Sequence, residues 1–188
     1  MVSTVVPERI RWAVDQLAPR PGERVLDIGS GTGVSVQLLV DQLGRTDAGS
    51  PTRPAIVAID RSAKAVERIR QRVAQAVADG TVDLRVLDIA GLGADVGPID
   101  AAFAVNVNAF WTSDAAAELD ALGRVLVPGG RLLLAYGDGP AAGMDQRHLD
   151  RVEASVAASP WFQVTRRLDG DHGSALVAVR AAGPADSW

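Results

Sequence analysis

The sequence contains no cysteine, and aromatic residues make up only 4% of it. The absence of cysteine excludes disulfide bonds, thiolate metal sites and a cysteine nucleophile. No apolar run reaches the roughly 18 residues that a membrane helix needs. Charges at Glu8, Arg9 and Arg11 end the apolar start of the chain before a signal-peptide core can form. We therefore expect a cytoplasmic protein with no membrane partner and no metal site.

The chain also lacks an excess of positive charge. Lys plus Arg number 19 against 23 Asp plus Glu, so the net charge is −4. A surface that binds phosphate backbones is normally basic, and we therefore expect no nucleic-acid partner. The 188 residues suffice for one domain with a substantial core. We assign residues 1–182 to that domain and 183–188 to a flexible C-terminal tail.

Hydrophobic segments of two kinds alternate along the chain. Apolar residues at helical spacing predict helices within 10–17, 36–43, 66–77, 119–126 and 149–156. Compact apolar runs predict strands at 24–28, 55–59, 82–87, 99–105, 131–136, 161–168 and 174–180. Strands that are apolar on both faces and alternate with helices favour a parallel sheet covered on both sides. The last two strands are too close in sequence for a parallel crossover, so they should form an antiparallel edge hairpin.

A glycine-rich turn follows the first strand, in the segment Asp27-Ile-Gly29-Ser-Gly31-Thr-Gly33. Such a turn lets the backbone approach a ligand, and the amides at the start of the next helix can bind an anion. A dinucleotide-binding loop would have its third glycine at position 34, which is Val34. The spacing therefore disfavours a nicotinamide-dependent oxidoreductase.

The turn resembles that of the class I S-adenosylmethionine-dependent methyltransferases, and the resemblance extends over residues 7–180. The matching stretches are the strand 56–60 with its terminal acid, the third strand with its acid at 84–89, the segment 99–106, and the Val-Pro-Gly-Gly turn within 122–134. The resemblance implies a doubly wound, Rossmann-like α/β fold. In this fold we expect a seven-stranded sheet of strand order 3-2-1-4-5-7-6, which is mostly parallel and ends in the antiparallel edge hairpin.

The resemblance also implies S-adenosyl-L-methionine as cofactor and assigns its contacts. Asp60 would bind the ribose hydroxyls, Asp88 the adenine amino group, and Ile89 the face of the ring. The methionine end would lie near Asn106 and the first-strand turn. The full expected set is Asp27, Gly29, Ser30, Gly31, Gly33, Asp60, Arg61, Asp88, Ile89 and Asn106. Alternatively, Asp60 caps the next helix, Asp88 is an ordinary turn residue and Asn106 an ordinary polar strand end. The three glycines could likewise form a purely structural turn.

No catalytic residue can be assigned from the sequence. His148 is interpreted as structural, and His172 as a turn residue far from the active edge. Asp138 has only a suggestive position after the fifth strand. The adjacent pair Phe110 and Trp111 either walls an acceptor pocket or packs in the core.

Trp12 faces away from the apolar stripe of its helix and could form a lid or a subunit contact. A homodimer is therefore left open. The predicted function is methyl transfer to a small-molecule acceptor. The alternative is a non-catalytic regulatory or interaction protein on the same fold.

Overall fold

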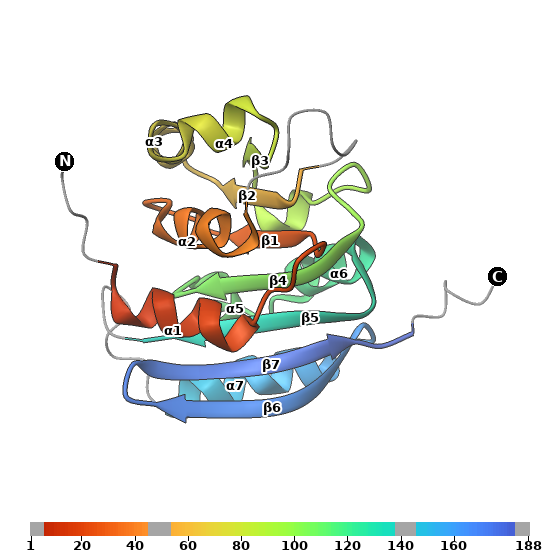
Figure 1. Cartoon of the computed structure of the whole chain (residues 1–188). Coiled ribbons are helices and arrows are strands. Elements are labelled where there is room, and N and C mark those ends of the chain that lie inside the picture. Colours follow the sequence, from red (N-terminus) through yellow and green to blue (C-terminus); the bar gives the residue numbers. More distant parts are fainter. Residues whose placement is uncertain (1–5, 45–53, 138–145, 183–188) are drawn as a thin grey trace.

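The computed structural model of the chain describes residues 6–44, 54–137 and 146–182. Its strands form one sheet of order β3-β2-β1-β4-β5-β7-β6, in which β7 alone runs antiparallel to β5 and β6 (Figure 1). The predicted fold and strand order are confirmed. The strands are β1 (Val25–Ile28), β2 (Ile56–Asp60), β3 (Val82–Val86), β4 (Ile99–Val105), β5 (Leu126–Tyr136), β6 (Phe162–Gly170) and β7 (Gly173–Arg180).

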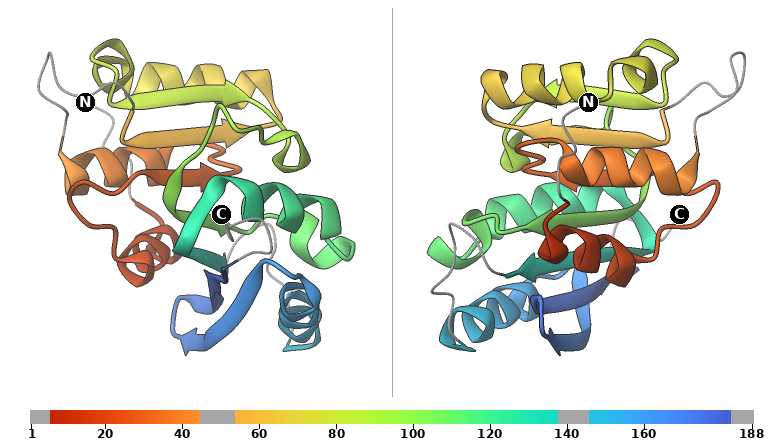
Figure 2. Two further views of the ribbon diagram at one scale, coloured as in Figure 1. Left: turned by 90° about the vertical axis from the view of Figure 1, so that its right-hand side faces the viewer. Right: turned by 60° about the vertical axis from the view of Figure 1, so that its left-hand side comes forward.

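Helices cover both faces of this sheet (Figures 1 and 2). One face carries α1 (Glu8–Leu17), α2 (Val34–Leu43), α3 (Ala63–Arg72) and α4 (Ala74–Ala78). The other carries α5 (Ala109–Thr112), α6 (Ala116–Val125), α7 (Gln146–Ala158) and the 3-10 turn η1 (Ile89–Gly91). Each layer encloses its own apolar cluster, as expected for a sheet that is buried on both sides.

Side chains alternate along β1, so successive residues of this strand pack against the helices on opposite faces of the sheet. Leu26 and Ile28 belong to the cluster beneath α6, whereas Val25 belongs to the cluster beneath α1 and α2. Because successive side chains of a strand point to opposite faces, Asp27 points to the same side as Val25. A carboxyl group is thus buried under α2 at the carboxyl end of the strand, where ligands of such sheets bind.

Two predicted helices differ from those in the structure. The helix predicted over 66–77 breaks at Val73, whose backbone is not helical (φ −115°, ψ 35°). The break divides it into α3 and α4, and Val73 and Ala76 both remain buried in the cluster on this face. The helix predicted through 126 ends at Val125, because Leu126 pairs with Ile99 and so begins β5. The turn at Pro128–Gly130 is therefore part of an 11-residue strand.

The hairpin between β6 and β7 is tighter than predicted, since only Asp171 and His172 separate the strands. Its position also corrects the placement of His172. Because β7 is antiparallel to β5, the hairpin turn lies at the carboxyl end of β5, where Tyr136 is opposite Ser174. A Cβ added to Gly137 would lie 2.3 Å from the His172 carbonyl oxygen. His172 is therefore beside the ligand-binding edge and not far from it.

Neither a membrane span nor a metal site is found in the part of the chain that the structure describes. No helix there is both long and apolar enough to cross a bilayer. Among the same residues, no group of three or more His, Cys, Asp and Glu side chains could hold a metal ion. Asp138 and the predicted tail 183–188 lie outside the described residues.

Candidate functional site

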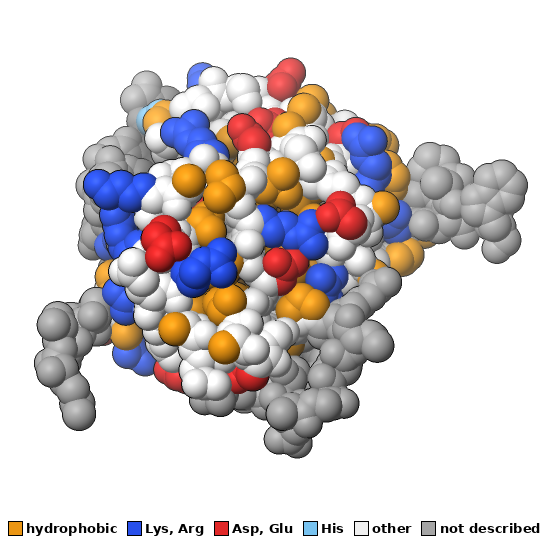
Figure 3. All heavy atoms as spheres, turned by 90° about the horizontal axis from the view of Figure 1, so that it is seen from above, with side chains coloured by type: hydrophobic (Ala, Val, Ile, Leu, Met, Phe, Trp, Pro, Cys, Tyr) orange, Lys and Arg blue, Asp and Glu red, His pale blue; other side chains and the backbone are white. Residues whose placement is uncertain are grey.

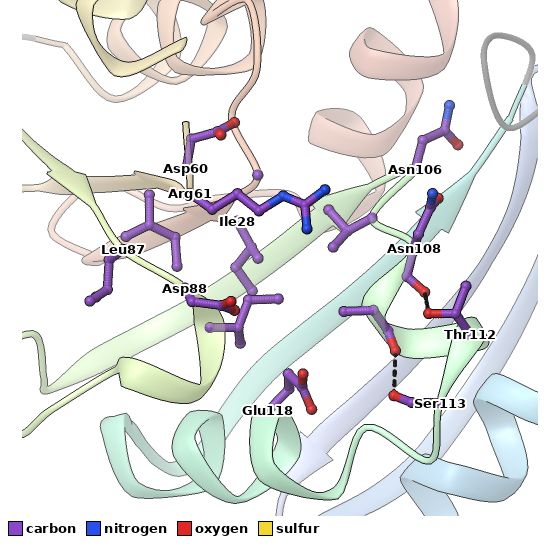
Figure 4. A pocket seen from close by; sticks show the side chains of 15 residues that line it. Ile28, Asp60, Arg61, Leu87, Asp88, Asn106, Asn108, Thr112, Ser113 and Glu118 are labelled. Atoms are coloured by element: carbon purple, nitrogen blue, oxygen red, sulfur yellow. Dashed lines mark hydrogen bonds between the residues drawn. The ribbon is translucent and has the colours of Figure 1, made fainter. Parts of the chain in front are cut away.

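Two adjoining cavities open at the carboxyl ends of the parallel strands. The larger has a volume of about 450 Å³ and extends from the ends of β2 and β3 to the segment after β4 (Figure 4). The smaller, of about 280 Å³, lies between the glycine turn and the start of α1. Gly29, Asn106 and Asn108 line both cavities. The pair therefore forms a continuous site of the size of ordinary small-molecule pockets.

The glycine turn lines the smaller cavity, reaches the larger one at Gly29, and depends on left-handed backbone angles. Gly29 has φ 67°, and an added Cβ would lie 2.8 Å from Cγ2 of Val107. A side chain there would be strained and would also clash with the wall of the site. Gly33, by contrast, lines neither cavity: it begins α2 and packs against Ile69, 3.0 Å from the place of its missing Cβ. The structure thus gives Gly33 a packing role.

Asp27 is the buried acid of the smaller cavity. Its side chain is only 2% exposed, and Oδ2 accepts a hydrogen bond of 2.6 Å from Oγ of Ser35. Burial raises the pKa of Asp27 to about 7, against the opposing hydrogen bonds from Ser35 and Ser30, and the nearby Asp60 charge adds to the rise. Near neutral pH this carboxyl group can therefore gain or lose a proton when a charged ligand binds beside it.

Asp60 joins the end of β2 to the two segments beside it. Oδ2 accepts a 3.0 Å hydrogen bond from the Gly31 amide, and Oδ1 accepts a 2.9 Å bond from the Ser62 amide. Ser62 in turn caps α3 by accepting from the Ala65 amide. The sequence alternatives for Asp60, a ligand contact or a helix-start residue, are compatible, since each carboxylate oxygen keeps a second lone pair. Asp60 also lines the larger cavity.

Asp88 lies across the larger cavity from Asn106 and Asn108 (Figure 4), and its chain neighbour Ile89 also lines this cavity. Asp88 is exposed, and no described group donates a hydrogen bond to its carboxylate. Ile89 is 6% exposed and belongs to the core beneath α6, so one side of it packs while another bounds the cavity. The exposed Arg61 extends from the end of β2 across the cavity toward Asn106 (Figure 4).

Asn106 lines both cavities, but its side-chain amide is bonded within the protein. Oδ1 accepts from the Gly137 amide at 3.0 Å, while Nδ2 donates to the Gly137 carbonyl oxygen at 3.3 Å. Its backbone is left-handed (φ 57°), and its own amide donates to the Ala135 carbonyl. Asn106 thus joins the ends of β4 and β5 at the boundary between the cavities.

The aromatic and histidine candidates do not line either cavity. Phe110 is 1% exposed in the core, and Trp111 packs against that core, so the core interpretation of the pair is confirmed. His148 meets Trp111 edge to face, with ring centroids 4.8 Å apart, so it packs against a ring of this core. Trp12 packs against the apolar cluster on its face, and its ring lies beside Gly170 at the end of β6. Neither a lid nor a subunit contact is needed to explain Trp12.

Among the lining residues that sequence reasoning missed, Ser35, Arg9 and Glu118 carry polar or charged side chains. Ser35 has the clearest signal, since it lies two residues beyond Gly33 on the first turn of α2, opposite the end of β1. Arg9 and Glu118 are charged residues of helices far away in sequence, yet they line the smaller and the larger cavity respectively. No local pattern in the sequence distinguishes these two partly buried residues from other helical charges.

Comparison with known proteins identifies a matching family. The family described as a methyltransferase domain matches residues 25–130. The chain is 34% identical over 137 residues to an uncharacterized 37.1 kDa protein in transposon TN4556 of Streptomyces fradiae. It is 32% identical over 145 residues to the protein-L-isoaspartate O-methyltransferase of Methylorubrum populi. The alignments cover 73% and 77% of this chain, but only 36% and 58% of these relatives.

Solved structures show the same fold. One is described as an S-adenosyl-L-methionine-dependent methyltransferase from Methanococcus maripaludis. It superposes with a TM-score of 0.72 at 16% identity, covering 94% of this chain and 85% of the other. At this identity the similarity concerns the arrangement of helices and strands, and the acceptor must be inferred from the site of this chain.

Proposed function

Since the chain belongs to the methyltransferase-domain family, we propose that it transfers the methyl group of S-adenosyl-L-methionine to a small-molecule acceptor. The observation that carries this proposal is the pair of adjoining cavities, with Asp60 and Asp88 in the larger and Asp27 in the smaller. Bound S-adenosylmethionine supplies an activated methyl group for in-line displacement by an acceptor. The protein's part is to hold donor and acceptor in line, so no catalytic triad is required.

The residues present fit this donor chemically. The Asp60 oxygens can accept from neighbouring hydroxyls of a ribose, and the free acceptors of Asp88 suit an exocyclic amine. Ile89 offers an apolar surface to a ring. Asp27 provides a negative charge, once ionised, for the ammonium of the methionine end. Gly29, which lines both cavities, adds no side chain between them.

A small acceptor is supported by the charge distribution. On the face formed by α3, α4 and β3, acidic side chains lie interspersed among the basic ones (Figure 3). Some of the arginines on this face are neutralised by carboxylates, as in the ion pairs Arg85–Asp83 and Arg70–Glu67. A surface of mixed sign with a net charge of −4 lacks the field that binds nucleic-acid backbones strongly. The relative in Methylorubrum populi makes isoaspartyl peptides a worthwhile second acceptor class for a turnover screen.

The first test is calorimetric titration of the purified protein with S-adenosylhomocysteine, with NADH as a parallel control. We expect micromolar binding of S-adenosylhomocysteine and none of NADH, since Val34 replaces the third glycine of a dinucleotide loop. Binding of NADH alone would overturn the proposed cofactor. Turnover of any acceptor with S-adenosylmethionine would then exclude the non-catalytic alternative.

Asp60→Ala should weaken the binding of S-adenosylhomocysteine by about 1–3 kcal/mol, because charge-assisted hydrogen bonds to the ribose are lost. Its bonds to Gly31 and Ser62 are lost as well, so the melting temperature is measured alongside. Asp95→Ala is the matched control, since Asp95 is an exposed carboxylate paired with Arg85 outside both cavities. An unchanged affinity in Asp60→Ala would remove Asp60 from the site.

A further inference from the structure

We propose that a small cavity at the other end of α1 from the candidate site binds a phosphate group, either the free ion or part of a small phosphate ester. The cavity has a volume of about 140 Å³ and lies where the end of α1 meets β5, β6 and β7 (Figure 1). Three arginines line this arginine cavity: Arg20, Arg131 and Arg166. The proposal goes beyond methyl transfer and does not depend on the proposed donor.

A β-bulge in β6 turns Arg166 toward the arginine cavity. Val164 is opposite Ala178 and Arg166 is opposite Val177, so Thr165 is an extra residue in the pairing. The Thr165 hydroxyl donates to the Val177 carbonyl oxygen at 3.1 Å. Val164 packs against the cluster on the α7 face, and without the extra residue Arg166 would share that face. The bulge instead places Arg166 on the α1 face, since bulges redirect the side chains that follow them.

The two adjacent arginines of β6 differ in their partners. Arg167 lies on the α7 face, where its guanidinium pairs with Asp150 at 2.6 Å and with Glu153 at 3.3 Å. Arg166 is exposed, and in the described part of the chain its side chain has no hydrogen bond or ion pair. The same holds, over the same ranges, for the side chain of the exposed Arg20. Two guanidinium groups at the arginine cavity therefore keep their donors for a ligand.

Arg131 is the fixed wall of the arginine cavity. Its two terminal nitrogens donate to the Glu23 carboxylate at 2.8 Å and 2.7 Å. Glu23 also accepts from the Arg20 amide at 2.9 Å, which joins the segment after α1 to β5. Asp100 adds a second carboxylate within electrostatic reach of Arg131. Three guanidinium groups and two carboxylates leave a local excess of positive charge, in a chain whose net charge is −4.

These features suit a tetrahedral oxyanion. Guanidinium groups from three segments can each donate to a different oxygen of a phosphate group, whereas a carboxylate has only two oxygens. Small-molecule pockets usually exceed about 300 Å³, so the arginine cavity holds one phosphate group and little more. Bound phosphate offsets the excess positive charge and joins the segment after α1 to β6.

The test is calorimetric titration of the unaltered protein with inorganic phosphate at constant ionic strength, with acetate and glycerol 3-phosphate as parallel probes. We expect phosphate to bind in the millimolar range and acetate at least about tenfold more weakly. Glycerol 3-phosphate distinguishes the two sources of the phosphate group. Binding as tight as that of phosphate or tighter supports a small phosphate ester as the ligand, and weaker binding supports the free ion.

Arg166→Ala should weaken the binding of phosphate about 10-fold or more, because charge-assisted hydrogen bonds are lost. Arg166→Lys should recover part of the lost affinity, since it keeps the charge but not the planar fork. Arg11→Ala is the matched control, because Arg11 is an exposed arginine of α1 that lines neither this cavity nor those of the candidate site. It should bind phosphate as the unaltered protein does. The melting temperature of each variant shows that it is folded.

Several results would overturn the proposal. They are failure of the unaltered protein to bind either phosphate or glycerol 3-phosphate, equal affinities for phosphate and acetate, and an unchanged phosphate affinity in Arg166→Ala. A DNA duplex that bound more tightly than phosphate, and lost affinity in Arg166→Ala, would also overturn it, because the arginines would then belong to a nucleic-acid surface. Arg166 lines neither cavity of the candidate site, so S-adenosylhomocysteine should bind Arg166→Ala and the unaltered protein alike. Failure of either proposal thus leaves the other standing.

Discussion

Binding of S-adenosylhomocysteine should weaken about tenfold for each pH unit below 7. In the free protein, burial raises the pKa of Asp27 to about 7, so the carboxyl group is largely protonated at lower pH. The ammonium of a ligand in the smaller cavity favours the ionised form, and binding must therefore release the proton. The affinity should rise from pH 5 to pH 7 by up to about 100-fold and then level off.

Calorimetry in buffers of different ionisation enthalpy measures this proton release directly. We expect close to one proton per ligand at pH 5.5 and almost none at pH 8.5. Asp27→Asn should bind more weakly at pH 8 and show no such pH dependence between 5 and 8. A proton release that persisted in Asp27→Asn would assign the titration to another group.

The same ionisation should affect the stability of the free protein. Because the pKa of Asp27 is higher in the folded chain than the value of 3.8 for an ordinary Asp, the folded state holds the proton more tightly. The contribution of Asp27 to the free energy of unfolding is therefore fully retained below about pH 4. It falls by up to about 4 kcal/mol as pH rises to 7. Denaturant unfolding of Asp27→Asn should lack this decline.

Gly123→Ala should lower the free energy of unfolding by about 3 kcal/mol, although alanine favours helices. A Cβ at Gly123, within α6, would lie 2.2 Å from Cγ of Trp161. Trp161 has little freedom to move away, because its Nε1 donates to Asp120 at 2.9 Å and the Arg180 guanidinium lies 5.1 Å from its ring centroid. Thermal unfolding should show a melting temperature lower by about 6–12 °C.

The same substitution in a Trp161→Ala variant shows whether contact with the Trp161 ring causes the loss of stability. With Trp161→Ala in place, the further change Gly123→Ala should be neutral or stabilising by up to about 1 kcal/mol, as helix propensity alone predicts. A melting temperature of Gly123→Ala equal to that of the unaltered protein would contradict the tight contact with Trp161.

The outline of the site was predictable because its signals are local. Asp27 and Asp60 each follow an apolar run at a strand end, and parallel strands bring such ends to one edge of the sheet. Boundaries were less predictable where pairing competed with helix formation: Leu126 continues the apolar pattern of α6, yet it pairs with Ile99. The role of Gly33 was missed for a related reason. A glycine that contacts a ligand and one that packs against Ile69 look alike in sequence.

By itself, the sequence determined the α/β class, the glycine turn and the acids at the strand ends. Each of these follows from spacing within a few residues. The tertiary structure alone decided the joining of Asn106 to Gly137, the placement of Arg9 beside Asp27 and the return of His172 to the ligand-binding edge. These features bring together segments that belong to different elements. They depend on the pairing of β4 with β5, on the reversed strand β7 and on the docking of α1.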